Sequence, residues 1–188
     1  MKILFISLGC DKNLADSEEM LGLLTGSGHE IVDSEEDADA IVINTCCFIH
    51  DAKEESVNTI LEMAEYKKTG KCKALIVTGC MAQRYKEEIT QEIPEVDAVL
   101  GTTSYGDIVK ALNEAQAGHV FQEFRDINEL PEDSGRRVLT TGGHFGYLKI
   151  AEGCDKHCTY CIIPSLRGKF RSVPEERLLA QAEYMASP

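Results

Sequence analysis

Short apolar runs alternate with stretches of helical periodicity up to about residue 125, and this alternation constrains the fold more than any other feature. Apolar residues recur at three-to-four spacing over residues 14–25, 51–68, 82–92 and 104–115, which predicts helices. Strands that alternate with helices are typical of an open, mainly parallel sheet with flanking helices, so we predict an α/β fold. The runs of strand length are Ile3 to Leu8, Ala40 to Asn44, Ala74 to Thr78 and Ala98 to Leu100, with weaker candidates at Glu30 to Val32 and His119 to Phe121.

Polar and conformationally special residues mark the ends of the predicted helices. Asn13 is the predicted N-cap of the first helix, and Gly26 and Gly28 are expected to end it. Pro94 ends the third predicted helix and Gly118 closes the fourth. These signals set the expected helix boundaries.

Residues 126–143 differ in composition from the sequence on either side. The segment combines acidic residues with Pro131, the pair Arg136-Arg137 and the run Thr-Thr-Gly-Gly. We interpret it as a linker between an amino-terminal domain, residues 1–125, and a second unit, residues 144–188. The second unit should contain a strand, a cysteine-rich loop and a helix over about residues 174–185.

Charge is distributed unevenly. Residues 1–134 contain 11 Lys and Arg against 27 Asp and Glu, whereas residues 135–188 contain 8 against 5. Because nucleic-acid binding depends on Lys and Arg that neutralise phosphates, we expect no direct nucleic-acid binding by this chain. The first residues lack the cleavage pattern of a secretory leader, and no run approaches the roughly 18 apolar residues of a membrane helix. The sequence therefore predicts a cytoplasmic protein without membrane association, whose eight cysteines are reduced.

Three cysteines, Cys154, Cys158 and Cys161, stand at C-x-x-x-C-x-x-C spacing. Thiolates are the usual ligands of iron–sulfur clusters, and the run lacks the fourth nearby cysteine of an electron carrier. Three ligands would leave one iron of a four-iron cluster open to chemistry. The alternative is a zinc site with His157 as fourth ligand, but zinc knuckles usually pair C-x-x-C with a second, distant pair, and none follows here.

Three further cysteines, Cys10, Cys46 and Cys80, each follow a predicted strand. In an open parallel sheet, ligands bind just beyond the carboxyl ends of the strands, so the three thiols are expected at one edge. Each also precedes a predicted helix, whose backbone amides and dipole would favour the thiolate. The alternative for any one of them is core packing, because cysteine is among the most buried residue types.

The remaining cysteines and histidines are not expected to belong to this site. Cys72 precedes its strand and should lie at the opposite end of the sheet, about 20 Å away at about 3.3 Å per residue. Cys47 adjoins Cys46, and side-chain alternation lets only one of the two reach the site without indicating which. Four histidines have no partnered spacing and are expected to be surface or packing residues: His29, His50, His119 and His144.

Together these motifs resemble the radical S-adenosylmethionine superfamily, whose signature is C-x-x-x-C-x-aromatic-C, with Tyr160 at the aromatic position. The flanking residues, Glu-Gly-Cys at 152–154 and Ile-Ile-Pro-Ser-Leu-Arg-Gly at 162–168, resemble the methylthiotransferase family in particular. The amino-terminal half resembles that family's own first domain in three segments: Gly-Cys-Asp-Lys-Asn-Leu at 9–14, Asn-Thr-Cys at 44–46 and Thr-Gly-Cys at 78–80. The first of these is similar to the branch that modifies a ribosomal protein, since the transfer-RNA branch more usually shows Gly-Cys-Gln-Met-Asn there.

The resemblance implies a role for each cysteine set. It implies that Cys154, Cys158 and Cys161 carry a [4Fe-4S] cluster that binds and cleaves S-adenosyl-L-methionine, with Tyr160 as a cofactor-binding residue. It implies a second [4Fe-4S] cluster on Cys10, Cys46 and Cys80, and it selects Cys46 over Cys47. The implied product is a methylthio group on the β-carbon of an aspartate in the twelfth small-subunit ribosomal protein, made with a sulfur donor and a low-potential electron donor.

The resemblance covers essentially all 188 residues and implies that residues 144–188 begin a partial (β/α) radical-SAM barrel. A complete barrel takes about 250 residues, so we expect the chain to be a fragment of a longer enzyme, inactive alone. Two alternatives remain open. One is a transfer-RNA adenosine methylthiotransferase, against which the acidic amino-terminal part argues, and the other is a non-catalytic iron–sulfur or zinc-binding module.

Overall fold

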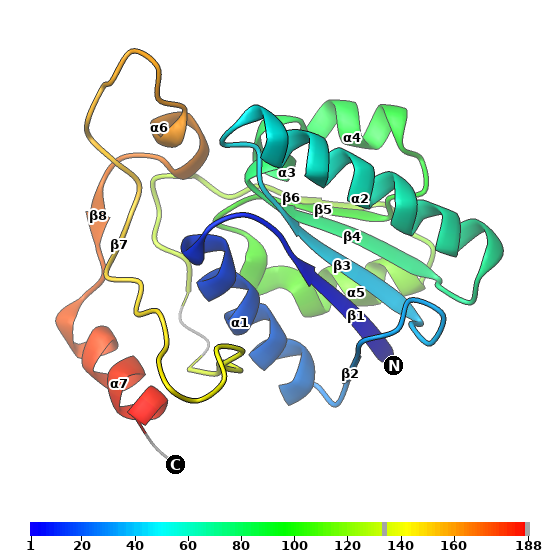
Figure 1. Cartoon of the computed structure of the whole chain (residues 1–188), viewed down its shortest axis with the longest axis horizontal. Helices are drawn as coiled ribbons and strands as arrows, with labels where there is room; N and C mark the ends of the chain where they lie inside the picture. Colours follow the sequence, from blue (N-terminus) through cyan, green and yellow to red (C-terminus); the bar gives the residue numbers. More distant parts are fainter. Residues whose placement is uncertain (133–134, 187–188) are drawn as a thin grey trace.

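The computed structural model describes residues 1–132 and 135–186 and is an α/β protein built on a six-stranded parallel sheet (Figure 1). The strand order is β2-β1-β3-β4-β5-β6, and every neighbouring pair in this sheet is parallel. The predicted fold class is confirmed. The last strand begins at Phe121 instead of His119, and the bounds of the six strands are β1 Lys2–Ser7, β2 Glu30–Val32, β3 Ala40–Thr45, β4 Ala74–Gly79, β5 Ala98–Leu100 and β6 Phe121–Glu123.

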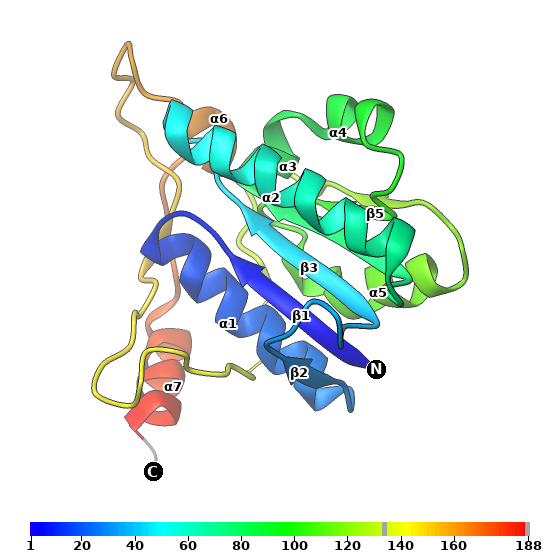
Figure 2. The same ribbon diagram turned by 45° about the vertical axis from the view of Figure 1, so that its right-hand side comes forward.

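Helices cover both faces of the sheet (Figures 1 and 2). On one face lie α1 (Asp11–Gly26) and α5 (Ile108–Gln116), the latter preceded by the 3-10 turn η1 (Tyr105–Asp107). On the other face lie α2 (His50–Thr69), α3 (Cys80–Arg84) and α4 (Lys86–Glu92). The central strands β3 and β4 are buried along their whole length, which is why their sequences read as nearly continuous apolar runs.

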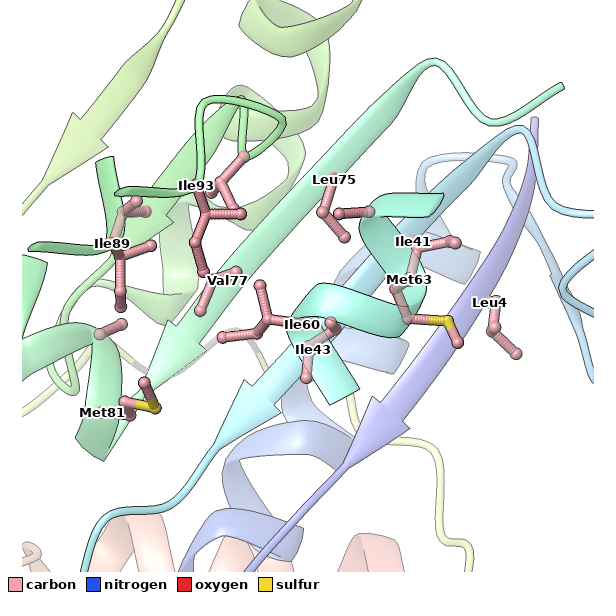
Figure 3. Close-up of a cluster of buried hydrophobic side chains, with 14 of the residues drawn as sticks. Leu4, Ile41, Ile43, Ile60, Met63, Leu75, Val77, Met81, Ile89 and Ile93 are labelled. Atoms are coloured by element: carbon pink, nitrogen blue, oxygen red, sulfur yellow. The ribbon is translucent and has the colours of Figure 1, made fainter. Parts of the chain in front are cut away.

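Alternate residues of each strand contribute to the two halves of the core. Ile41 and Ile43 face the α2 side, where Ile60 packs against them, and Val42 between them faces the α1 side. Figure 3 shows the α2 side, with strand residues directed toward residues of α2, α3 and α4. Full burial of each such aliphatic side chain contributes about 1.5–3 kcal/mol. Because successive strand residues point to opposite faces, apolar side chains of the same strands pack against helices on both faces of the sheet.

Two helix predictions are corrected by the structure. Asn13 is not the N-cap of α1, because Cys10 takes that place and Asn13 lies inside the helix with a fully buried side chain. The helix predicted over residues 82–92 is two helices, since Tyr85 leaves the helical conformation between α3 and α4. The Tyr85 ring lies against the ammonium group of Lys53 on α2, a contact that local periodicity does not encode.

The carboxyl-terminal part contains two short strands and two helices: β7 Ala151–Glu152, α6 Ile163–Arg167, β8 Arg171–Ser172 and α7 Glu175–Ala186. β7 and β8 pair antiparallel, as a small sheet beside the main one (Figure 1). The strands of a (β/α) barrel are parallel, so the expected start of a barrel is not seen among the described residues and stays a prediction. The helix predicted over residues 174–185 is present as α7.

Part of the segment interpreted as a linker over residues 126–143, namely residues 136–140, packs against α1. The Arg137 guanidinium pairs with the buried Glu18 carboxylate at 2.6 Å, and the Val138 amide donates to the Glu18 carbonyl oxygen at 3.0 Å. A Cβ on Gly22 would come within 2.7 Å of the Arg136 backbone, so the glycine permits the close approach. The domain division stays a prediction. Among the described residues, no helix combines the length and hydrophobicity required to span a bilayer.

Candidate functional site

Cys10, Cys46 and Cys80 line one cavity at the carboxyl ends of β1, β3 and β4. These strands are adjacent and end in register, with Ser7 beside Asn44. The order of the sheet reverses between β1 and β3, and ligands of doubly wound sheets bind at such a switch point. The cavity has a volume of about 960 Å³, at the upper end of the roughly 300–1,000 Å³ of small-molecule sites. The structure thus brings together the three cysteines that the sequence placed at one edge.

Glycines before two of the cysteines allow this close packing. Gly9 has a φ of +95°, and a Cβ there would lie 2.6 Å from the Cβ of Cys46. Gly79 has a φ of +93°, and a Cβ there would lie 2.3 Å from the side-chain oxygen of Asn44. Only glycine adopts this conformation without strain and leaves room for the neighbouring loop. The two Gly-Cys pairs therefore draw Cys10 and Cys80 toward the end of β3.

The Asn13 side chain fastens the loops that carry the cysteines. Its amide nitrogen donates to the carbonyl oxygens of Leu8 and Thr45, both at 2.9 Å, and so joins the loop after β1 to the end of β3. Its amide oxygen accepts hydrogen bonds from Arg167 at 2.6 Å and from the Cys80 thiol at 3.7 Å. Sequence reasoning missed this role, although Asn13 stands three residues after Cys10 in the motif that carries the resemblance.

The neighbouring cysteines Cys46 and Cys47 have different surroundings. Cys46 lines the cavity, whereas Cys47 is packed in the core on the α2 side and its thiol donates to the Cys80 carbonyl oxygen at 3.3 Å. Burial raises the pKa of Cys47 to about 11. Cys72 is buried in the loop before β4, at the opposite end of the sheet, as predicted. Of the adjacent pair, only Cys46 therefore borders the cavity.

The expectation that helix starts favour thiolates is not met at Cys80. Burial raises the pKa of this thiol, and the nearby Arg167 guanidinium opposes the shift without cancelling it. Cys80 begins α3, but α3 has only five residues and a correspondingly small dipole. Cys10 occupies the N-cap of the long helix α1 and is exposed. Cys46 lies four residues before the first residue of α2, so it is neither the N-cap nor in the first turn of that helix.

The other cysteine set lies on a loop between β7 and α6. Cys154 and Cys161 are partly buried and Cys158 is exposed. The Cys154 amide donates to the Gly168 carbonyl oxygen at 3.1 Å, which closes the loop at its base. Tyr160 is 91% exposed. The loop runs directly into α6, and α6 forms a wall of the cavity of Cys10, Cys46 and Cys80 (Figure 2 shows α6 beside α2 and α3).

All eight cysteines are free thiols. Within residues 1–132 and 135–186, no three or more His, Cys, Asp or Glu side chains converge tightly enough to hold a single metal ion. A four-iron cluster makes a different demand, because each cysteine binds a different iron and the sulfurs surround the cluster instead of converging on one point. The donor set and the shared cavity of Cys10, Cys46 and Cys80 fit such a group.

A buried ionic network joins α1 to the segment that carries the second cysteine set. Arg167 donates to Asp16 at 2.6 Å, and Lys149 pairs with both Asp16 and Glu152. Burial alone would raise the pKa of Glu152, but Lys149 and Arg167 outweigh it and hold the pKa at about 2. Sequence reasoning assigned these residues no role. Only Glu152 and Arg167 stand in the segments that carry the resemblance, and Asp16 and Lys149 had no signal in the sequence analysis.

Comparison with known proteins agrees with this architecture. Residues 2–101 match the family model described as Uncharacterized protein family UPF0004. The chain is 63% identical over 186 residues to a protein of Lachnoclostridium phytofermentans named "Ribosomal protein uS12 methylthiotransferase RimO". Proteins of the same name from Clostridioides difficile and Geobacter sulfurreducens are 49% and 46% identical. In each case the alignment covers 99% of this chain and 42% of the relative, so the chain spans about two fifths of these relatives' length.

The family model covers more than half of the chain, from the beginning of β1 to the end of β5, and so includes Cys10, Cys46 and Cys80 with the strands that position them. The chain belongs to the family described as Uncharacterized protein family UPF0004.

Proposed function

We propose that this chain is part of a radical-SAM methylthiotransferase that modifies ribosomal protein uS12. The observation that carries the proposal is the cavity at the carboxyl ends of β1, β3 and β4, which is lined by three free thiols and walled by the helix that follows the second cysteine set. The names of the relatives support the same activity and substrate. The acceptor is the β-carbon of an aspartate in uS12.

The proposed ligand sets follow the two cysteine groups. Cys10, Cys46 and Cys80 hold one [4Fe-4S] cluster, and Cys154, Cys158 and Cys161 hold another, at which S-adenosyl-L-methionine binds with Tyr160 beside it. With three cysteines each, both clusters keep one iron free of protein ligands. When bound, these groups supply the radical and sulfur chemistry, and the protein supplies binding, orientation and shielding from water.

The residues around the cavity perform that supporting work. Asn13 fixes the loops after β1 and β3, so the thiols of Cys10 and Cys46 keep their separation. Leu166 and Ile163 of α6 form an apolar wall, and Leu166 is almost fully buried. Arg167 adds a positive charge on the same side. Such a wall excludes water on one side and leaves the rim open to a substrate.

The proposed activity requires partners. These are uS12, a sulfur donor, a low-potential electron donor and S-adenosyl-L-methionine, and modification of a ribosomal protein places the enzyme in the cytoplasm. In this proposal residues 1–125 form the amino-terminal methylthiotransferase domain, 126–143 the connection and 144–188 the beginning of the radical-SAM unit.

A chimeric protein tests the proposal. This chain would replace the matching segment of the Lachnoclostridium phytofermentans relative, in a host strain that lacks its own uS12 methylthiotransferase. We expect mass spectrometry of uS12 to show the mass increase of one methylthio group. Chimeras with Cys10→Ala or Cys154→Ala should leave uS12 unmodified, and only Cys154→Ala should also abolish cleavage of S-adenosyl-L-methionine.

Transfer RNA from the same strains would be digested and analysed in parallel. More methylthiolated adenosine in the transfer RNA than in the host strain without the chimera, together with unmodified uS12, would contradict the proposed substrate. Unmodified products together with no cleavage of S-adenosyl-L-methionine by the unaltered chimera would contradict the proposed activity and favour a non-catalytic module.

A further inference from the structure

Arg167, the last residue of α6, lies six positions after Cys161 and is only 3% exposed. One terminal nitrogen of its guanidinium donates to Asp16 at 2.6 Å, and the other donates to the side-chain oxygen of Asn13 at 2.6 Å. Both partners belong to α1, the helix that begins directly after Cys10. Arg167 therefore connects α6, which follows the second cysteine set, to α1, which follows Cys10.

The same guanidinium lies beside the cavity. Arg167 and Cys80 both line it, and the Asn13 oxygen that accepts from Arg167 also accepts from the Cys80 thiol. Arg167 is close enough to Cys80 to oppose the effect of burial on the pKa of that thiol. A positive charge is thus held at the cavity wall by contacts with α1.

Residue chemistry favours an arginine at this position. The planar guanidinium donates in several fixed directions at once, and here its partners lie on two elements: α1, through Asp16 and Asn13, and β7, through Glu152. Burial removes water from the charge at a free-energy cost, which the ion pairs with Asp16 and Glu152 offset. An apolar residue would fill the space at lower cost but would provide neither the connection nor the charge.

We propose that Arg167 is a positioning residue that docks the loop of Cys154, Cys158 and Cys161 against the cavity of Cys10, Cys46 and Cys80 and places a buried positive charge beside that cavity. One side chain would then set both the separation of the two cysteine sets and the electrostatic environment of the first. The electrostatic role, unlike the docking role, rests on the proposed cluster at Cys10, Cys46 and Cys80.

Arg137 offers a matched control. It is also buried, also pairs with an acidic residue of α1, Glu18, and also anchors the carboxyl-terminal part, but it does not line the cavity of the cysteines. Arg167→Gln and Arg137→Gln therefore remove comparable ion pairs, and only the first removes a charge from the cavity. Arg167→Lys keeps the charge and loses the fork of donors.

The first measurement is hydrogen exchange on the metal-free chain. We expect Arg167→Gln to accelerate exchange in residues 153–168 about tenfold or more, because the docking contacts of α6 are lost. Arg137→Gln should accelerate exchange around residues 136–140 and leave 153–168 unchanged. Equal exchange of residues 153–168 in the two variants would overturn the docking role.

The second measurement is the reduction potential of the cluster at Cys10, Cys46 and Cys80, reconstituted without oxygen in a chain whose Cys154, Cys158 and Cys161 are replaced by alanine. The reduced cluster carries one more negative charge, so loss of a nearby cation should shift the potential to more negative values in Arg167→Gln. Arg167→Lys keeps the charge, so its potential should stay close to that of the chain with Arg167. Arg137→Gln should not shift the potential. The same potential in Arg167→Gln and Arg137→Gln would overturn the electrostatic role.

The two measurements separate this inference from the proposed function. If the alanine-substituted chain binds no iron, the proposed ligand set is wrong, and the exchange experiment, which needs no metal, still upholds or overturns the docking role. If iron binds and neither measurement distinguishes Arg167 from Arg137, the proposed ligand set stands and the inference is wrong.

Discussion

At the scale of single residues, the proposed cluster site depends on which thiols face the cavity. Cys46 and Cys47 are neighbours in sequence with opposite surroundings, one lining the cavity and the other packed in the core. The side-chain alternation of a strand separates such neighbours but does not show which one faces outward. Family resemblance selected Cys46, and the structure places Cys46 at the cavity.

This pair provides a direct prediction. Cys46→Ala should lose about four irons per chain after anaerobic reconstitution, because one cluster ligand is gone. Cys47→Ala should keep its iron and lose only about 1 kcal/mol of folding free energy, from a small core defect. Iron analysis and urea denaturation measure the two effects. Greater iron loss in Cys47→Ala than in Cys46→Ala would show that the assignment is reversed.

The buried carboxyl group of Glu19 predicts how the stability of the chain depends on pH. Burial raises the pKa of Glu19 above its ordinary value of 4.5, and the Tyr105 hydroxyl donates to its carboxyl group at 3.1 Å. The folded chain therefore holds this proton more tightly than the unfolded chain. The resulting penalty is absent below pH 4.5, grows as the pH rises toward the folded-state pKa, and is constant above it.

Glu19→Gln removes the charge and keeps an acceptor for Tyr105. We expect the variant to be more stable than the parent chain at neutral pH, with a difference that vanishes below pH 4.5. Urea denaturation across this range measures the difference in free energy of unfolding. A stability advantage that grows as the pH falls would contradict the argument.

At the scale of elements, the Gly-Cys turns after β1 and β4 place thiols against the end of β3. Gly9 and Gly118 both have positive φ angles, but a Cβ on Gly9 would meet Cys46, whereas a Cβ on Gly118 would meet nothing within 4 Å. Gly118→Ala should therefore cost about 1 kcal/mol from backbone strain alone. Gly9→Ala should cost about 3 kcal/mol, because overpacking adds about 1–3 kcal/mol.

Denaturation of the two glycine variants measures these costs, and iron analysis shows whether Gly9→Ala also disturbs the cavity. Equal destabilisation by Gly9→Ala and Gly118→Ala would mean that the turn is not packed tightly against Cys46. Loss of iron in Gly118→Ala would point to an effect unrelated to the site.

Sequence periodicity predicted the elements of the sheet well, because each buried strand reads as a short apolar run with helical periods between. Periodicity failed to predict helix boundaries that are set by tertiary contacts. The helix over residues 82–92 breaks at Tyr85, whose ring lies against Lys53, and Asn13 lies in the helix interior, where it donates to carbonyl oxygens of the loop after β1 and the end of β3. The five-residue helix α6 is too short to leave a periodic signal, so it was not predicted.

At the scale of the whole molecule, the cysteines of the first set were predictable as a group, since parallel topology brings the carboxyl ends of β1, β3 and β4 together. The attachment of the segment that carries the second cysteine set to α1 was not predictable. It depends on Arg167, Lys149 and Glu152 pairing with α1, partners more than 130 positions away. Long-range ion pairs leave no periodic trace in a sequence.

The packing of residues 136–140 on α1 was missed for the same reason. Acidic composition, proline and glycine are typical of linkers, yet Glu18 accepts from Arg137 and from the backbone amide and hydroxyl of Thr140. The first helix thus anchors the carboxyl-terminal part at two places, through Glu18 and through Asp16. This double attachment holds α6 and its preceding loop beside the cavity.

The proposed function requires two independent sets of three cysteines, each of which holds a four-iron cluster. Iron and acid-labile sulfide per chain after anaerobic reconstitution test it most directly. We predict about eight irons for the unaltered chain and about four for each of two variants, one with alanine at Cys10, Cys46 and Cys80 and one with alanine at Cys154, Cys158 and Cys161. Iron content that is unchanged by either triple substitution, or tightly bound zinc in place of iron, would contradict the account.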